Sequence, residues 1–192
     1  MKKLIYKIWS KFLIIFGELK IVKWFPWIQY DPIEYKMTAD KIRRVLSLVK
    51  PGDVLLRRYD GYVDNAFIDG KYSHAGIYIG NDMVIHAINP TVTEIDVIDF
   101  CRCDNICILR PTSGQTHAMS VARKYLADGV TYDFNYQPTD EALYCFELCA
   151  KCYPNLDIKL FDVKYIFGLL RRTAYLGKSF IESPDFTIVE EF

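Results

Sequence analysis

The chain has 192 residues, half of them hydrophobic, with 24 basic and 24 acidic residues and therefore no formal net charge. This composition favours one folded domain with a substantial core and argues against a disordered chain. Nucleic acid is not an expected partner, because no basic stripe with interleaved aromatic residues occurs in the body of the chain. Residues 1–50 hold eleven basic and four acidic residues, so contact of this segment with an acidic surface is expected.

The first segment, residues 2–24, has apolar side chains at helical spacing and lysines along another face. Its longest uncharged stretch, Phe12 to Gly17, is too short to cross a bilayer, which takes about 20 residues. Charged residues interrupt the apolar run and no small-residue cleavage site follows. No cleavable signal peptide is therefore recognised, and an uncleaved or atypical export signal is an alternative.

Two interpretations of this segment stand side by side. In one, the helix packs on the body of the protein. In the other, it lies in a membrane interface, helped by Trp24, Phe25 and Trp27. The second interpretation predicts membrane-surface contact through residues 1–27. The protein is accordingly expected to be cytoplasmic or peripherally membrane-associated.

The rest of the chain reads as helix, strands and helices. In chain order we expect a helix over 38–49, a turn at 51–53, a strand from residue 54, a loop or short helix over 57–70, strands over 73–79, 83–88, 93–97 and 105–110, a helix over 116–127, and a helix from 141 or 144 to 152. This order predicts an α+β domain with segregated layers. We divide the chain into an N-terminal helical segment (1–50), a core (51–153) and a C-terminal extension packed on that core (154–192).

Two of the three histidines lie on the strands of a predicted hairpin. His74 and His86 flank the turn Gly80-Asn81-Asp82. Because their separation is even, both imidazoles are expected side by side on one face if no bulge intervenes. His117 lies in a loop that leads to a helix, and we interpret it as a surface or capping residue.

Cys145 lies at the predicted start of a helix. A helix N-terminus and a neighbouring imidazole both stabilise a thiolate and lower the pKa of the thiol. His74 would take the thiol proton and return it to the leaving group, while His86 would hold the other ring nitrogen of His74. These residues are the inventory of a cysteine hydrolase. By spacing alone, a structural histidine pair and a metal site with one carboxylate remain alternatives.

The six cysteines form two triplets along the chain. Their spacings, C-x-C-x3-C and C-x3-C-x2-C, lack the paired C-x2-C knuckles of structural zinc sites. We therefore expect no metal there, and small buried thiols in a reducing compartment.

Six short motifs, taken in order, carry a family resemblance: Gly52-Asp53-Val54-Leu55, residues 72–80, Ile85-His86-Ala87, Ile108-Leu109-Arg110-Pro111, residues 129–133 and residues 144–148. Together they resemble the NlpC superfamily of papain-like cysteine hydrolases, in its circularly permuted YiiX-like branch. In unpermuted members the cysteine helix precedes the histidine strands, whereas here the cysteine follows them. The resemblance covers roughly residues 51–152 and implies a papain-like core, an antiparallel sheet or barrel packed against helices.

The resemblance also implies roles for individual residues. Cys145 would be the nucleophile, His74 the general base and His86 the third member of a Cys-His-His triad, with no cofactor and no metal. Tyr132 matches a tyrosine that lies near the nucleophile in this superfamily. Its hydroxyl and the Cys145 backbone N–H could stabilise an oxyanion, the alternative being an aromatic core residue.

The implied reaction is cleavage of an amide or ester bond through an acyl-enzyme thioester. The expected substrate is a small peptide, an amide or a lipid-like molecule, such as a cell-wall peptide or a lipid-linked group. One departure concerns Phe146, where permuted members commonly have serine. Its ring could narrow the cleft or merely pack, so an inactive ligand-binding module of the same fold is an alternative, and a lipid acyltransferase is another.

Overall fold

The structure is a computed structural model that describes the backbone of residues 2–17, 20–21, 28–29, 35–62, 70–136, 141–165 and 170–192. Side chains are described for residues 4–16, 35–62, 70–136, 141–163 and 172–192. Trp24, Phe25 and Trp27, and the turn-rich segment 137–140 before the cysteine helix, lie outside the described residues.

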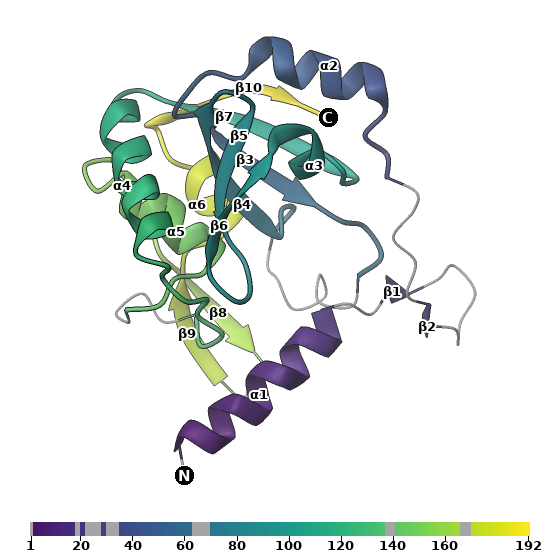
Figure 1. The fold of residues 1–192 in the computed structure, drawn as a ribbon, viewed down its shortest axis with the longest axis vertical. Helices are drawn as coiled ribbons and strands as arrows, with labels where there is room; N and C mark the ends of the chain where they lie inside the picture. The colour runs from purple at the N-terminus through teal and green to yellow at the C-terminus, as the bar shows by residue number, and fades with distance from the viewer. Residues whose placement is uncertain are drawn as a thin grey trace.

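An antiparallel sheet with the strand order β10-β7-β3-β4-β5-β6 forms the centre of the molecule (Figure 1). Its strands are β3 (Val54–Arg58), β4 (His74–Gly80), β5 (Met83–Ala87), β6 (Val92–Asp96), β7 (Asn105–Pro111) and β10 (Phe186–Glu191). Two separate strand pairs are β1 (Lys20–Ile21) with β2 (Ile28–Gln29), and β8 (Phe161–Tyr165) with β9 (Leu170–Ala174). The helices are α1 (Lys2–Gly17), α2 (Ala39–Leu48), α3 (Val97–Phe100), α4 (Gln115–Ala127), α5 (Cys145–Cys152) and α6 (Gly177–Ile181).

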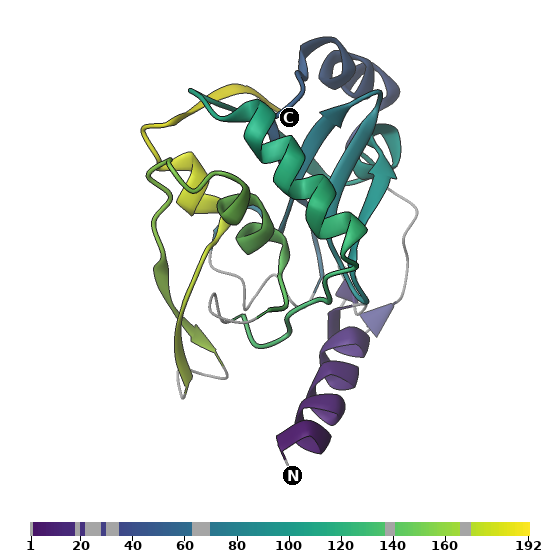
Figure 2. The ribbon, with the colours of Figure 1, turned by 60° about the vertical axis from the view of Figure 1, so that its left-hand side comes forward.

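Helices cover both faces of the sheet. Helices α4, α5 and α6 lie on one face, and α2 and α3 lie on the other (Figures 1 and 2). Each face has its own apolar cluster of buried residues, one containing Ala75 and Cys145 and the other containing Tyr78 and Phe100. This layered α+β arrangement confirms the fold class expected from the element order.

The expected hairpin forms with a two-residue turn between β4 and β5. Asn81 and Asp82 have φ values of 51° and 59°, the positive values that a type I′ turn requires at both central positions. Asparagine and aspartate tolerate this region better than other side chains. The pairing shifts register between Tyr78 and Gly80, so the turn and this irregularity together set His74 and His86 on neighbouring strands.

Several elements differ from expectation. The first helix ends at Gly17 and not at residue 24, and glycine is a poor helix former. Strand β3 runs on to Arg58, where a loop was expected from residue 57. The four-residue helix α3 was not expected, and its N-cap is Asp96, which accepts a hydrogen bond from the Ile98 N–H.

The C-terminal segment contributes to the main sheet. Strand β10 pairs with β7, with Ile188 opposite Leu109, so residues beyond 153 supply an edge strand. Near the same edge, the Asp53 carboxylate accepts two hydrogen bonds from the Arg110 guanidinium, at 3.0 and 2.8 Å. Two residues of the sequence motifs thus join the start of β3 to β7. None of the described helices is long and apolar enough to span a bilayer.

Candidate active site

The two histidines of the hairpin are hydrogen-bonded to each other. His74 Nε2 lies 2.8 Å from His86 Nδ1, with the ring planes nearly perpendicular at 83°. His86 is buried and His74 is half-buried. The prediction that the two imidazoles lie side by side is confirmed. Because His74 uses Nε2 for this bond, its Nδ1 is the ring nitrogen left for a third group.

Gly76 makes room for this pair. A Cβ at this position would lie 2.6 Å from Val84 Cγ1 and 3.0 Å from Phe100 Cε2. The space is filled by the Phe100 ring, whose centroid is 5.9 Å from the His74 ring and 5.8 Å from the His86 ring. Glycine in the motif is therefore a packing requirement, since any side chain would displace the ring that supports both imidazoles.

Cys145 is the first residue of α5 and is 4% exposed. Its sulfur lies against the backbone amides of Ala75 and Phe146. The Ala75 amide belongs to the peptide that joins Ala75 to His74, so the thiol and the base expected from the sequence are brought to the same end of β4. This position at the helix N-terminus is the one predicted.

The electrostatic state of the thiol differs from expectation. Burial raises the pKa of Cys145 to about 11, and the amides of Ala75 and Phe146 and the charge of Arg57 offset only part of that effect. Burial also lowers the pKa of His74 well below its ordinary value, and the pKa of His86 to about 3, with Arg57 adding to both shifts. Both imidazoles and the thiol are therefore neutral near pH 7. The sequence expectation of a lowered thiol pKa is wrong because desolvation outweighs the helix N-terminus.

The thiol and the imidazoles pack toward different faces at the end of β4. Ala75 and Cys145 belong to the cluster under α4 and α5, whereas the histidine rings contact Phe100 of the other cluster. Among the described residues no hydrogen bond joins the Cys145 sulfur to a His74 nitrogen. The pairing of β4 with β5 begins at Ile77, so β4 has no partner on this side at His74.

Arg57 is a member of the site that sequence reasoning missed. It lies directly across from His74 in the β3–β4 register and is 5% exposed. Its guanidinium carbon is 4.3 Å from the Phe100 ring centroid, and Nη1 donates to the Phe100 carbonyl at 3.1 Å. Its Nε has no hydrogen-bond partner among the described residues. The available signal was a charged residue continuing the apolar run Val54-Leu55-Leu56.

Tyr132 lies beside the cysteine helix. It forms a bridge with Leu143, two residues before Cys145, and its ring packs on Phe134 with centroids 4.9 Å apart. Burial raises the pKa of Tyr132 well above its ordinary value, and Tyr136 and Cys145 add to the shift. Its hydroxyl therefore stays protonated, and it is hydrogen-bonded to the Tyr136 side chain.

Phe146 points into the core. It is 3% exposed and its ring lies 6.4 Å from that of Phe180 in α6. Of the two sequence interpretations of this residue, narrowing the cleft or packing, the structure supports packing. His117 is exposed in the first turn of α4, as expected of a surface residue.

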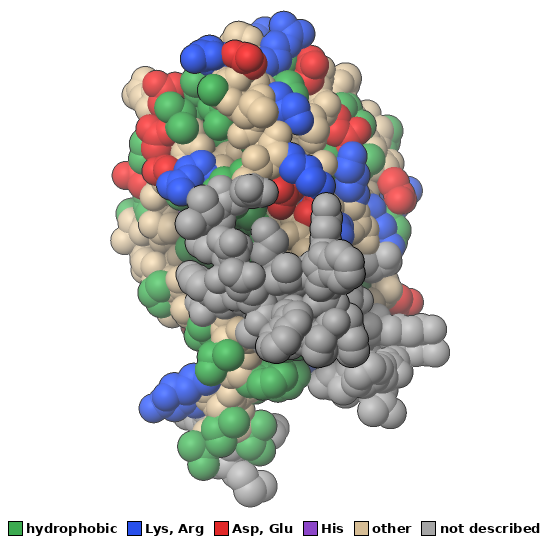
Figure 3. Space-filling view, turned by 90° about the vertical axis from the view of Figure 1, so that its right-hand side faces the viewer, with side chains coloured by type: hydrophobic (Ala, Val, Ile, Leu, Met, Phe, Trp, Pro, Cys, Tyr) green, Lys and Arg blue, Asp and Glu red, His purple; other side chains and the backbone are tan. Residues whose placement is uncertain are grey.

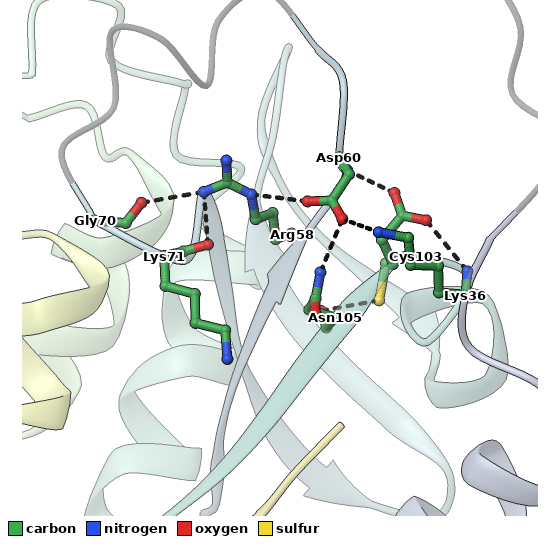
Figure 4. A network of polar contacts seen from close by, with 8 residues as sticks. Lys36, Arg58, Asp60, Gly70, Lys71, Cys103 and Asn105 are labelled. Atoms are coloured by element: carbon green, nitrogen blue, oxygen red, sulfur yellow. Dashed lines mark hydrogen bonds and ion pairs between the residues drawn. The ribbon is translucent and has the colours of Figure 1, made fainter. Parts of the chain in front are cut away.

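A polar network fixes the chain just before His74 (Figure 4). Arg58 donates to the carbonyls of Gly70 and Lys71 at 3.2 and 2.9 Å. Its Nε also bonds Asp60 at 3.0 Å, and Asp60 is paired with Lys36. The end of β3 thereby holds the entry to β4, which begins at His74.

The six cysteines are all free thiols and all buried. This agrees with the interpretation of small buried hydrophobic residues.

Comparison with known proteins identifies the family of the chain. Residues 48–189 match the family described as permuted papain-like amidase enzyme, YaeF/YiiX, C92 family. The chain belongs to this family. It is therefore a cysteine peptidase or amidase-type hydrolase, and the resemblance drawn from the sequence motifs is confirmed. The comparison with curated proteins finds no match.

A solved structure shares the fold. The metalloprotein yiiX from Escherichia coli O157:H7 aligns with a TM-score of 0.63 and 18% identity, over 76% of this chain and 98% of that one. At this identity the likeness shows the fold alone. In the described part of this chain no three His, Cys, Asp or Glu side chains gather as metal ligands. His74 and His86 each direct one ring nitrogen at the other.

Proposed function

We propose that this hydrolase cleaves an amide or ester through an acyl-enzyme thioester on Cys145, with His74 as general base and His86 as the residue that orients it. The observation that carries the proposal is the 2.8 Å bond between His74 Nε2 and His86 Nδ1. This bond leaves Nδ1 as the free ring nitrogen of His74. The amide of the next residue, Ala75, lies against the Cys145 sulfur. Catalytic contacts often tighten only when substrate binds, so we expect the Cys145 sulfur and His74 Nδ1 to approach each other in the substrate complex.

Protons and bonds balance in two half-reactions. His74 Nδ1 takes the Cys145 thiol proton as the sulfur attacks the carbonyl carbon, and it gives that proton to the leaving amine or alcohol as the C–N or C–O bond breaks. Water then attacks the thioester, His74 accepts a proton from it, and the C–S bond breaks with return of the proton to sulfur. Nδ1 of His74 must be unprotonated before it can take the thiol proton in the first half-reaction. His74 therefore carries its proton on Nε2 and donates it to His86 Nδ1.

Two donors support the oxyanion that forms in each step. The Cys145 backbone N–H is at the N-terminus of α5, where amide groups have no helical partner. The Tyr132 hydroxyl stays protonated because burial raises the pKa of this residue. Removing one such donor from an enzyme typically slows the reaction by about 10²- to 10³-fold.

The substrate class follows from the surroundings of the site. Tyr132 and Phe134 are half-buried aromatic side chains next to the cysteine helix. This apolar border suits an amide or ester with a lipid-like acyl group better than a highly charged cell-wall peptide. Transfer of the same acyl group to another acceptor would use the same thioester.

A ligand-binding module without catalysis is the second candidate. The specific observation in its favour is the raised pKa of Cys145, about 11, which leaves little thiolate near pH 7. Phe146 no longer supports this candidate, because its ring packs in the core.

A mechanism-based thiol probe separates the two candidates. We expect a vinyl sulfone probe to label wild-type protein stoichiometrically at Cys145, with labelling lost in Cys145→Ala and slowed in His74→Ala. Cys149→Ala is the matched control, since Cys149 is buried on the same helix and should not affect labelling. Labelling of the wild type no faster than that of His74→Ala would favour the binding module.

A further inference from the structure

Helix α1 exposes an unusually large apolar surface. Five large hydrophobic side chains on this 16-residue helix are between 50% and 64% exposed: Leu4, Ile5, Ile8, Phe12 and Ile15. At 3.6 residues per turn their spacing gathers them on one side of the helix. A contiguous exposed patch of this kind marks an interaction site and not ordinary surface.

Basic side chains border this apolar stripe. Lys7 and Lys11 are exposed and lie one turn apart beside Leu4 on the helix surface. The sequence from residue 2 to residue 17 contains no aspartate or glutamate. An apolar stripe with a basic border is the pattern of helices that lie in the interface of anionic membranes.

The opposite side of α1 attaches to the segment beside the nucleophile. The Tyr6 hydroxyl donates to the Tyr132 carbonyl and accepts from the Phe134 N–H, both at 3.5 Å. The Tyr6 and Phe134 rings also meet edge to face, with centroids 6.4 Å apart. The helix is thereby linked to the border of the active site while its apolar stripe points away from this contact.

The figures show the same arrangement at the scale of the molecule. Helix α1 and the β8–β9 hairpin project from one end of the body, opposite the C-terminus (Figures 1 and 2). Hydrophobic side chains and a basic one are visible on the part of the chain that projects below the body (Figure 3).

We propose that α1 is a docking surface for an anionic lipid bilayer, with the apolar stripe in the acyl region and the lysines at the headgroups. Charge decides between lipid and a second copy of the chain. Because residues 2–17 contain no aspartate or glutamate, the same helix of a second copy offers no opposite charge to the lysines, whereas anionic headgroups neutralise them. Through Tyr6, docking holds the Tyr132 side of the active site at the membrane. The delivery of a lipid-like substrate to Cys145 rests, in addition, on the proposed function.

The test is co-sedimentation of the full chain with vesicles. We expect wild type to bind vesicles of equal parts phosphatidylglycerol and phosphatidylcholine, and to bind pure phosphatidylcholine about tenfold or more weakly. The double substitution Ile8→Glu/Phe12→Glu should weaken binding to the mixed vesicles about tenfold or more. Ile98→Glu is the matched control, because Ile98 is 48% exposed on α3, and it should bind like wild type.

Three results would overturn the docking proposal. They are absence of wild-type binding, equal binding by the Ile8→Glu/Phe12→Glu protein, and a wild-type dimer in lipid-free solution that this substitution converts to monomer. The last would assign the stripe to self-association. Binding is read without turnover, and Cys145→Ala should bind as wild type does, so failure of the hydrolase assignment would leave this result unchanged.

Discussion

His74 and His86 share one hydrogen bond, and that bond fixes which nitrogen of His74 can act as a base. With Nε2 committed to His86 Nδ1 at 2.8 Å, only Nδ1 is available for Cys145. The two residues are twelve positions apart, and the type I′ turn together with the register shift between Tyr78 and Gly80 sets their pairing. A short local motif thus determines which ring nitrogens of the two histidines face each other.

Substitution of the two histidines should have unequal effects. We expect His74→Ala to lower kcat/KM for a p-nitrophenyl acyl ester by about 10³-fold, because proton transfer is lost. His86→Ala should lose about 10- to 100-fold, since only the orientation of His74 is affected. His86→Asn should recover part of the loss through its amide oxygen. A His86→Ala enzyme with wild-type kinetics would remove His86 from the site.

The charge of Arg57 should shift the pKa of the thiol and the pKa of both histidines in the same direction. Its charge lowers the pKa of Cys145 and of both imidazoles, so Arg57→Met should raise all three values. We expect iodoacetamide labelling of Cys145 at pH 8 to slow about three- to tenfold, and its pH profile to move to higher pH. The histidine resonances in NMR should titrate at higher pH as well.

Arg57→Lys is the matched control, because it keeps the charge. It should retain most of the wild-type profile. Equal profiles in Arg57→Met and wild type would show that the arginine serves packing alone.

Phe146→Ser should lower the stability of the fold without changing the residues that carry out the proposed reaction. The ring is 3% exposed in the core, and truncation of a buried phenylalanine costs about 3–5 kcal/mol. Urea denaturation measures the loss, and Phe146→Leu should fall between the two proteins. A Phe146→Ser protein as stable as wild type and more active would instead mean that the ring obstructs the cleft.

Glu147 should give the stability a pH dependence. It is fully buried beside Lys151, and burial raises its pKa from 4.5 to about 7. The folded state therefore holds this proton more tightly than the unfolded state. Stabilisation is full below about pH 4.5 and is lost as the pH rises to about 7.

Comparison with Glu147→Gln isolates this effect. The free energy of unfolding of wild type relative to the variant should fall by on the order of 2 kcal/mol between pH 5 and pH 7.5. The charged neighbours Lys151 and Asp133 are present in both proteins, so they do not account for the difference. If the difference in free energy of unfolding between the two proteins stays constant across this range, Glu147 is ionised in the folded state throughout it.

Local patterns in the sequence predicted much of the fold and the positions of the site residues. The hairpin followed from a turn sequence, and the start of α5 from the apolar pattern after Tyr144. Each of these is decided within a few residues. The ordered motifs added the permuted papain-like family, which spacing alone left open.

Other features depend on contacts between distant segments. Strand β10 is recognisable only through its pairing with β7, and Arg57 joins the site because it lies opposite His74. The raised pKa of Cys145 has the same origin. Helix position favours the thiolate, but burial by the packed helices outweighs it, and burial is a property of the whole fold.

The most direct test of the central claim is to trap the acyl-enzyme on a p-nitrophenyl acyl ester by acid quench, intact mass measurement and peptide mapping. We expect one acyl group per chain, carried by Cys145. It should be absent from Cys145→Ala, accumulate far more slowly in His74→Ala, and appear unchanged in Cys149→Ala. Ester turnover by Cys145→Ala, or an acyl group carried by any other residue, would contradict it.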